Sequence, residues 1–464
     1  MASASDKFAR LSALRPIHPR RVVTQMDTHF AGEFRQQTEE ECALARMIGA
    51  TVSENEFGCH LRVRNWHATP EFTEPSRVVI ELLEKRCAPK KPGHPEDRPG
   101  QENSRAQDPQ NWLFLDTETT GISGGTGTYA FLIGIAWWEA GGLQIEQFLM
   151  RDFSEEHSVL LELSARIAER PVLVTFNGKT FDWPLLESRY VMTRSIGVPQ
   201  LSAHLDLLHP ARAIWKLRLG SVRLMELEQH VLDARRLGWD RADDVPSAMI
   251  PQFYFDYLRG RSVAPLAAVV RHNRNDLRGL AALFGKLNEL LGSEAYRKDS
   301  DGLDLFGLSR FLDRRGEVRR ARSACAAARE HGLPIALDAL AQWQLAKMAK
   351  RHGEHTEAAR IWQELSRDAD WRAAACEELA RFHERQRKDL AAALGYARQA
   401  MAVLRRNGRV PACREDTVKG RYQALSRVEL QRFERLRKKV VRLEMRLAKN
   451  RRTAPGQSRM PGAA

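Results

Sequence analysis

The strongest constraint on the fold is an apolar run that ends in two acids. Residues 112–121 read Trp-Leu-Phe-Leu-Asp-Thr-Glu-Thr-Thr-Gly. The apolar run predicts a buried strand, and side chains two apart on a strand point to the same face, so Asp116 and Glu118 would lie side by side. Carboxylates that close repel each other unless a cation lies between them, which predicts a divalent metal ion. The alternative is a plain turn, because Asp, Thr and Gly are common where strands end.

Two downstream segments supply further acids. Residues 171–182 predict a second buried strand, followed by Asn-Gly-Lys-Thr-Phe and then Asp182. Residues 272–276, His-Asn-Arg-Asn-Asp, lie in a segment with helical periodicity, in which His272 and Asp276 would share a face. Carboxylates on separate elements are hard oxygen ligands, which suit Mg²⁺ or Mn²⁺ better than zinc. Two such ions, roughly 3.5–4 Å apart, would bind the attacking and leaving oxygens of a phosphodiester.

These motifs resemble those of the DEDD superfamily of 3′→5′ exonucleases, which has a ribonuclease-H-like fold, and within it the bacterial YprB-type branch. The matching pieces are Asp-Thr-Glu-Thr-Thr-Gly at 116–121, Asn-Gly-Lys-Thr-Phe-Asp at 177–182, and Asp276 with a His shortly before it. They occur in order, and the resemblance covers roughly residues 50–295. It implies a metal-dependent nuclease with two Mg²⁺ or Mn²⁺ ions. The expected ligands are Asp116, Glu118, Asp182 and Asp276.

The third motif departs from the superfamily pattern at the position of the general base. Members carry either a His five residues before the last Asp or a Tyr four residues before it. Here His272 is four residues before Asp276, and Arg271 is five before it. A His is the better base near neutral pH, since its unperturbed pKa is ~6.5 against ~10 for Tyr. We therefore expect His272 to be the catalytic base; the alternative is a surface residue of a charged helix.

The loops beside the acids are candidate substrate contacts. Residues 121–127, Gly-Ile-Ser-Gly-Gly-Thr-Gly, lack the Lys and Ser or Thr of a nucleoside-triphosphate loop. The bare amides of this loop would lie near the terminal nucleotide of a substrate, unless the loop is only a flexible hairpin connection. Asp206 either lies near the site or simply ends a short strand. The residues expected to contact the substrate are Thr119, Gly121, Asn177 and Lys179.

The segments between the motifs predict an α/β fold, a ribonuclease-H-like mixed sheet flanked by helices. Strands and turn residues alternate first, then helices and strands. The first three strands should form an antiparallel meander. The predicted strands are 112–116, 129–138, 143–150, 171–177 and 205–208, and the predicted helices are 157–169, 181–191 and further helices to about 295.

Composition suggests several domains in the 464 residues. An N-terminal segment, 1–86, contains a plausible strand at 57–63. Residues 87–111 are rich in Pro, Lys, Glu, Gln and Asn, which predicts a linker ahead of the exonuclease domain at 112–295.

Small residues recur from residue 303 to 410. Ala321 and Ala358 each follow a Gly-Glu pair by the same offset and are 37 residues apart, and Ala393 comes 35 residues after Ala358. This period is close to the ~34 residues of tetratricopeptide-like helix pairs, although an irregular all-α bundle is the alternative. Stacked repeats form a concave surface, where we expect a protein partner to bind.

Charge is unevenly distributed along the chain. Residues 301–464 hold 36 basic and 20 acidic residues, a net +16, whereas residues 1–300 hold 37 and 39, a net −2. Residues 421–464 alone hold 13 basic and 3 acidic residues, a net +10. Such asymmetry predicts binding to the phosphate backbone of DNA or RNA, and the alternative is a solvated basic surface. We expect a basic helix at 420–450 and a disordered tail at 451–464.

Hydropathy and the cysteines indicate the cellular compartment of the protein. No apolar run approaches the ~18 residues that a membrane span requires, and residues 1–21 lack the apolar core of a secretory signal. The six cysteines are scattered without a Cys-x-x-Cys pair, which argues against a zinc site and for the reducing cytoplasm.

The sequence therefore predicts metal-dependent phosphodiester hydrolysis of nucleic acid, with 3′→5′ exonuclease action as the expected form. Two alternatives remain at this stage. One is a non-catalytic nucleic-acid-binding or scaffold protein on a nuclease-like fold. The other is a structure-specific endonuclease, which the same metal chemistry permits.

Overall fold

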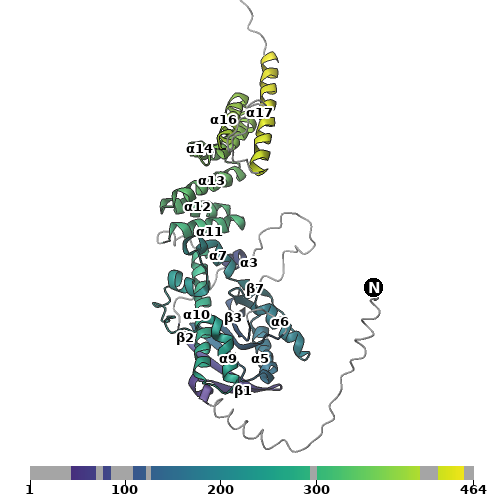
Figure 1. The fold of residues 1–464 in the computed structure, drawn as a ribbon, viewed down its shortest axis with the longest axis vertical. Coiled ribbons are helices and arrows are strands. Elements are labelled where there is room, and N and C mark those ends of the chain that lie inside the picture. The colour runs from purple at the N-terminus through teal and green to yellow at the C-terminus, as the bar shows by residue number, and fades with distance from the viewer. Residues whose placement is uncertain are drawn as a thin grey trace, which may run out of the picture.

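The computed structural model describes residues 43–68, 77–84, 108–121, 127–139, 141–292, 300–407 and 427–453. A sheet with helices on both faces is followed by a stack of paired helices that stands on one end of the sheet domain (Figure 1). Parts of the sequence predictions fall outside these residues. They include residues 1–42 of the N-terminal segment, the linker at 87–107, the glycine-rich loop at 122–126, residues 420–426 of the basic helix and the tail at 454–464.

The described residues form one mixed sheet of seven strands, in the order β1-β2-β5-β4-β3-β6-β7. β3, β4 and β5 pair antiparallel, as predicted, and β6 and β7 run parallel to β3. The α/β fold class is therefore confirmed, with a hairpin of two further strands on the β5 edge. The strands are β1 (Thr51–Asn55), β2 (Gly58–Ala68), β3 (Trp112–Thr119), β4 (Ala130–Glu139), β5 (Gly142–Leu149), β6 (Val172–Thr175) and β7 (Ala203–Asp206).

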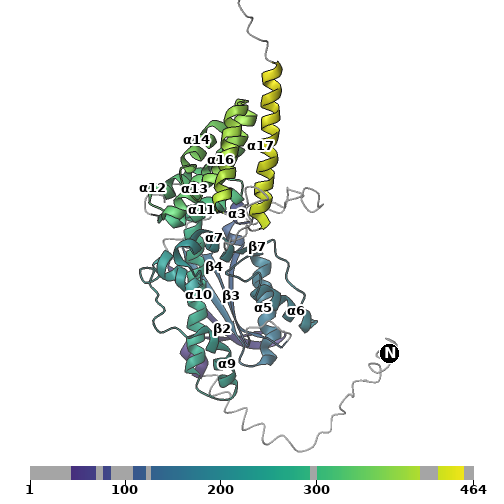
Figure 2. The same ribbon diagram turned by 45° about the horizontal axis from the view of Figure 1, so that its top comes forward.

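Helices cover both faces of the sheet (Figure 2). One face packs on α5 and α6, and the other packs on α10, α7 and α3. The helices of this domain are α3 (Arg77–Glu84), α5 (Glu156–Glu169), α6 (Asp182–Thr193), α7 (Leu208–Leu219), α8 (Leu224–Leu227), α9 (Ile250–Leu258) and α10 (Ala264–Gly292). Short helical turns are η1 (Pro109–Asn111), η2 (Phe153–Glu155), η3 (Glu228–Leu232) and η4 (Ser247–Met249).

The alternation of side chains along β3 positions the site. Leu113 and Leu115 face α5 and α6, whereas Trp112 and Phe114 face α10. The ring of Trp112 meets Phe284 of α10 edge to face, with centroids 4.6 Å apart. Since side chains two apart share a face, the acids that follow on β3 also face α10. The helix is held by apolar packing at one end and reaches the acids at the other.

The C-terminal helices form antiparallel pairs. Gly316 and Gly353 have positive φ of 83° and 81°, and each ends the turn before the second helix of a pair. Lys388 has φ of 57° at the corresponding place in the third pair, so the same backbone geometry recurs there with lysine in place of glycine. The helices of this array are α11 (Gly302–Arg314), α12 (Val318–Glu330), α13 (Ile335–Arg351), α14 (His355–Leu365), α15 (Arg372–Phe382) and α16 (Leu390–Asn407), with η6 (His383–Arg387) after α15.

The first helix of the array belongs to the core of the sheet domain. Leu305 and Phe306 of α11 are fully buried in the same apolar cluster as Ile214 of α7. Gly307 lies so close to α7 that a Cβ there would be 2.2 Å from the carbonyl oxygen of Ile214. The contact therefore requires glycine, and it joins the array to the sheet through shared side chains.

A long basic helix, α17 (Arg427–Thr453), closes the array. Its apolar seam, which includes Phe433 and Leu436, packs against α16. Between residues 430 and 450 the helix carries 8 basic and 2 acidic residues, so its outer surface is strongly positive. Among the helices of the described residues, none is long and apolar enough to cross a membrane.

A candidate metal site between strand β3 and helix α10

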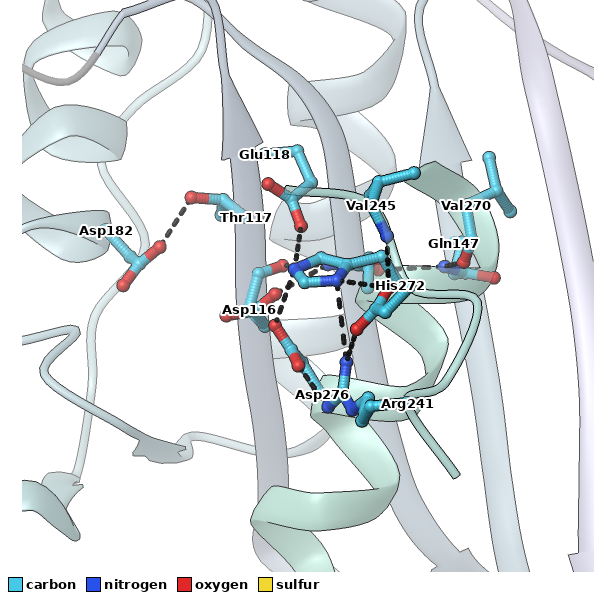
Figure 3. A network of polar contacts seen from close by, with 12 residues as sticks. Asp116, Thr117, Glu118, Gln147, Asp182, Arg241, Val245, Val270, His272 and Asp276 are labelled. Carbon is cyan, nitrogen blue, oxygen red and sulfur yellow. Dashed lines mark hydrogen bonds and ion pairs between the residues drawn. The ribbon is translucent and has the colours of Figure 1, made fainter. Parts of the chain in front are cut away.

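The site lies where α10 crosses the end of β3 (Figure 3). His272 and Asp276 are one helical turn apart on α10, and Asp116 and Glu118 are two residues apart on β3. One ligand atom from each of Glu118, His272 and Asp276 lies within 4.8 Å of the others. The structure thus brings together two of the predicted carboxylate ligands and the predicted base, with Asp116 beside them.

His272 points into this group with one ring nitrogen. Its Nε2 lies 3.4 Å from Oδ2 of Asp276 and 3.8 Å from Oε1 of Glu118. Its Nδ1 lies 2.7 Å from Oδ1 of Asp244, on the segment between η3 and η4. The side chain is only 11 % exposed, which excludes the surface-residue alternative.

Asp116 is held by a chain of buried amides. Nδ2 of Asn273 donates to Oδ2 of Asp116 at 2.8 Å, and Nε2 of Gln147 donates to Oδ1 of Asn273 at 2.8 Å and to the carbonyl of Val270 at 2.9 Å. The carbonyl of Val270 can only accept, so the amide nitrogen of Gln147 must point toward it. This nitrogen also donates to the amide oxygen of Asn273, which leaves the amide nitrogen of Asn273 directed at Asp116. Gly134, which pairs with Asp116 on β4, leaves room for this chain, since a Cβ there would lie 2.1 Å from Oδ1 of Asn273.

Asp276 is held by a guanidinium that the sequence analysis did not identify. Arg241 donates to Oδ1 of Asp276, to Oδ2 of Asp244 at 2.7 Å, and to both carboxylate oxygens of Glu228 at 2.7 Å. The arginine is buried, and these carboxylates raise its pKa although burial alone would lower it. It is therefore a permanent cation against one oxygen of Asp276.

Asp182 lies to one side of the other acids. It begins α6, and Oγ1 of Thr117 donates to its Oδ1 at 2.5 Å. Thr117 lies between Asp116 and Glu118 on β3, so its side chain points to the opposite face. Asp182 is therefore close enough to influence the other acids electrostatically, but it is outside the Glu118–His272–Asp276 cluster.

The carboxyl groups are poorly stabilised as anions. Burial raises the pKa of Asp116, and the charges of Asp276, Glu118 and Asp182 raise it further. Burial also raises the pKa of Glu118 to about 8, against the opposing charge of His272. Burial raises the pKa of Asp182 to about 6, although the hydrogen bond from Thr117 opposes it. Several acids that resist ionisation at one place are typical of a site that binds a cation.

The imidazole of His272, unlike the carboxyl groups, is stabilised in its charged form. Burial alone would lower the pKa of His272, but the hydrogen bond to Asp244 and the charges of Asp276 and Glu118 raise it to about 9. Its environment therefore places a positive charge, a proton or an ion, at Nε2.

Asp206 is the last residue of β7 and also lies near the acids, since burial and then the charge of Asp206 raise the pKa of Asp182. Its carboxylate accepts hydrogen bonds from the backbone N–H groups of Asn177 at 2.8 Å, Lys179 at 3.2 Å and Leu208 at 3.0 Å. Asn177 has φ of 71°, so the loop makes a tight turn that this carboxylate stabilises. Asp206 thus positions the loop that leads into Asp182. It does not belong to the acidic cluster.

The predicted substrate contacts lie around the same edge of the sheet. Thr119 ends β3, and its hydroxyl donates to the carbonyl of Gly121 at 2.8 Å. Asn177 and Lys179 lie on the loop held by Asp206. The residues that the sequence analysis missed are Gln147, Glu228, Arg241, Asp244 and Asn273.

The comparisons with known proteins agree with this architecture. Residues 113–288 match the family model described as the RNase_H superfamily. The sheet domain is therefore a ribonuclease-H-like domain, as the motifs predicted. Over 304 residues, 65% of this chain and 71% of the relative, the chain is 28% identical to "Uncharacterized protein YprB" of Bacillus subtilis (strain 168), which confirms the predicted resemblance.

One solved structure is also similar. It is the family B DNA polymerase from the hyperthermophilic archaeon Pyrobaculum calidifontis, with 16% sequence identity and a TM-score of 0.29. The similarity covers 44% of this chain and 29% of the polymerase.

Proposed function

We propose that this protein is a metal-dependent nuclease that hydrolyses phosphodiester bonds in nucleic acid, acting as a 3′→5′ exonuclease. The observation that carries the proposal is the group of ligand atoms from Glu118, His272 and Asp276, with Asp116 beside it. Such a group on a ribonuclease-H-like domain supports nuclease chemistry more directly than the fold alone, because one fold hosts many functions.

The side chains present fit a divalent ion. Burial raises the pKa values of Asp116, Glu118 and Asp182, so added positive charge would stabilise their ionised forms. Mg²⁺ or Mn²⁺ is the proposed cofactor, as two ions held by Asp116, Glu118, Asp182 and Asp276. When bound, the ions would supply the positive charge that stabilises a phosphoryl transition state.

The residues around the acids have separate proposed roles. His272 would orient or deprotonate the attacking water. Asp244 fixes the orientation of the imidazole. Thr119, Gly121, Asn177 and Lys179 contact the terminal nucleotide of the substrate.

The C-terminal part supplies affinity in this proposal. The basic surface of α17 would bind the phosphate backbone through counterion release. The paired helices are proposed to be tetratricopeptide-like and to bind a protein partner. The cytoplasm is the proposed location.

The decisive assay uses the full chain with Mn²⁺ or Mg²⁺ on end-labelled single- and double-stranded DNA and RNA. We expect shortening from the 3′ end that EDTA abolishes and that Asp116→Asn lacks. Circular substrates and substrates with a blocked 3′ end separate exonuclease from endonuclease action. Binding without cleavage of any substrate, in protein that has bound the ion, would contradict the enzymatic proposal and leave the scaffold alternative.

A further inference from the structure

The imidazole of His272 presents an electron-rich nitrogen to two carboxylates. Asp244, its partner at Nδ1, is itself fixed by Arg241 at 2.7 Å and by the backbone N–H of Val245 at 2.9 Å. A carboxylate held in this way is an acceptor, so Nδ1 of His272 carries the hydrogen. Nε2 then faces the oxygens of Glu118 and Asp276, and its lone pair can bind an ion once the proton there is displaced. Three such ligand atoms at this separation can share either a proton or a metal ion.

We propose that Nε2 of His272 is a ligand of one of the two divalent ions together with Glu118 and Asp276, and that this ligand set selects Mn²⁺ over Mg²⁺. The inference rests on the proposed nuclease site and identifies its ion. It also replaces the role of general base for this residue. An imidazole that binds an ion through Nε2 and donates from Nδ1 has no lone pair left to accept a proton from water.

The distances suit a single ion. Ligands bonded at roughly 2.1 Å around one octahedral ion lie roughly 3.0 Å apart when adjacent and roughly 4.2 Å apart when opposite. The separations of Nε2 from the oxygens of Asp276 and Glu118, 3.4 Å and 3.8 Å, fall between these limits. All three ligand atoms lie within 4.8 Å of one another, so small movements would bring them to the same ion.

The surroundings match a metal-binding histidine. Histidine ligands almost always donate their other ring N–H to a carboxylate or carbonyl, which fixes the tautomer and raises the basicity of the ligand nitrogen. Asp244 is that carboxylate. Arg241 meanwhile holds Oδ1 of Asp276 and leaves Oδ2 on the side of the imidazole.

The ligand set also determines which ion is preferred. Mg²⁺ strongly favours oxygen ligands and gives up its water reluctantly. First-row transition ions accept imidazole nitrogen more readily, and Mn²⁺ also suits carboxylates. Two carboxylates and one imidazole at the same place therefore favour Mn²⁺.

The test is pulsed electron paramagnetic resonance of Mn²⁺ bound to the full-length protein. A nitrogen ligand produces a hyperfine coupling to ¹⁴N, and ¹⁵N-labelled histidine must change that coupling in the wild-type chain, so the result needs no variant. We expect the coupling in the wild type, its loss in His272→Ala and its retention in His352→Ala, which removes an exposed histidine of the helical array. Asp244→Asn should lower Mn²⁺ affinity by about 10–100-fold, as loss of a ligand's carboxylate partner does.

The outcomes separate this inference from the proposed function. Mn²⁺ that binds in the wild type and is lost from Glu118→Gln, but shows no nitrogen coupling, would overturn the histidine ligand and leave the nuclease site intact. Failure of Mn²⁺ to bind at all would overturn both. Equal Mg²⁺ and Mn²⁺ affinities in competition titrations would overturn the selectivity.

Discussion

Asn273 of α10 donates a hydrogen bond to the carboxylate of Asp116 on β3, with Nδ2 and Oδ2 2.8 Å apart. Two further aspartates of the site are held in the same way, each by a donor on one oxygen. Thr117 holds Asp182, and Arg241 holds Asp276. Fixed donors of this kind hold carboxylates in place before an ion or substrate arrives, which lowers the entropic cost of binding.

Asn273→Ala should weaken divalent-ion binding by about 10–100-fold, because it removes the donor that orients Asp116. Isothermal titration with Mn²⁺ measures the change, and Asn288→Ala, at another buried asparagine of α10, is the matched control. An affinity equal to that of the wild type would show that Asp116 needs no such support.

Gly134→Ala should disturb the same hydrogen bond from the opposite side. Its Cβ would lie 2.1 Å from Oδ1 of Asn273, so the amide must move away from Asp116. We expect a loss of about 1–3 kcal/mol in the free energy of unfolding, as overpacking causes, together with weaker ion binding. Gly127→Ala is the control, because a Cβ at Gly127 would have no atom within 4 Å. Unfolding in urea measures the first effect, and an unchanged midpoint would contradict it.

Asp116→Ala should reduce hydrolysis by about 10²–10³-fold or more without loss of the fold, since charge stabilisation of the transition state is lost. In the absence of ions the variant should unfold at the same temperature as the wild type or a higher one. Burial and neighbouring acids raise the pKa of Asp116, so its charge opposes folding. A folded variant with full activity would refute the assignment of the site.

Ion binding should strengthen as pH rises. The folded protein keeps protons on Glu118 and Asp182 up to about pH 8 and about pH 6, above their ordinary values of 4.5 and 3.8. Between its ordinary pKa and its raised pKa, each group binds more protons in the folded state than in the unfolded chain. When EDTA keeps the site free of ions, the free energy of unfolding should therefore fall as pH rises through this range. Since an ion must displace the protons, the rise in Tm with Mn²⁺ should be larger at about pH 8 than at about pH 6. A shift that does not depend on pH would contradict the assignment.

Neutralising the basic surface of α17 should weaken nucleic-acid binding and make it less sensitive to salt. The triple variant Arg435→Gln, Arg437→Gln, Lys438→Gln changes exposed residues of this helix. The slope of log affinity against log salt should fall by about 0.9 for each phosphate of duplex DNA that the variant no longer neutralises. The control neutralises Arg259 and Arg261, which follow α9 on the sheet domain. A slope that matches the wild type would favour a protein partner for the helical array.

The sequence predicted the parts of the site that follow a periodic pattern. Asp116 and Glu118 are two apart on a strand, and His272 and Asp276 are four apart on a helix, so their faces could be inferred before their contacts were known. The role of Arg241 could not be predicted in this way, because the residue lies in an irregular segment that is positioned only by tertiary contacts.

Two glycines mark positions where another group approaches the backbone closely. Gly134 interrupts an apolar strand, and Gly279 interrupts the apolar pattern of α10; isolated glycines at such positions indicate close approach of another group. A Cβ at Gly279 would lie 1.9 Å from Oε1 of Glu228, the partner of Arg241. These glycines show where Asn273 and Glu228 enter the site, but only the fold identifies which residue enters.

The close contact of Gly307 with the carbonyl of Ile214 determines how the helical array is attached to the sheet domain. Because α11 shares buried side chains with α7, apolar packing holds the base of the helical array on the sheet domain. The array is therefore a spacer whose length is set by helix packing and not by a tether. A polymer held at once by α17 and by the acids would have to bridge a span that the protein itself defines.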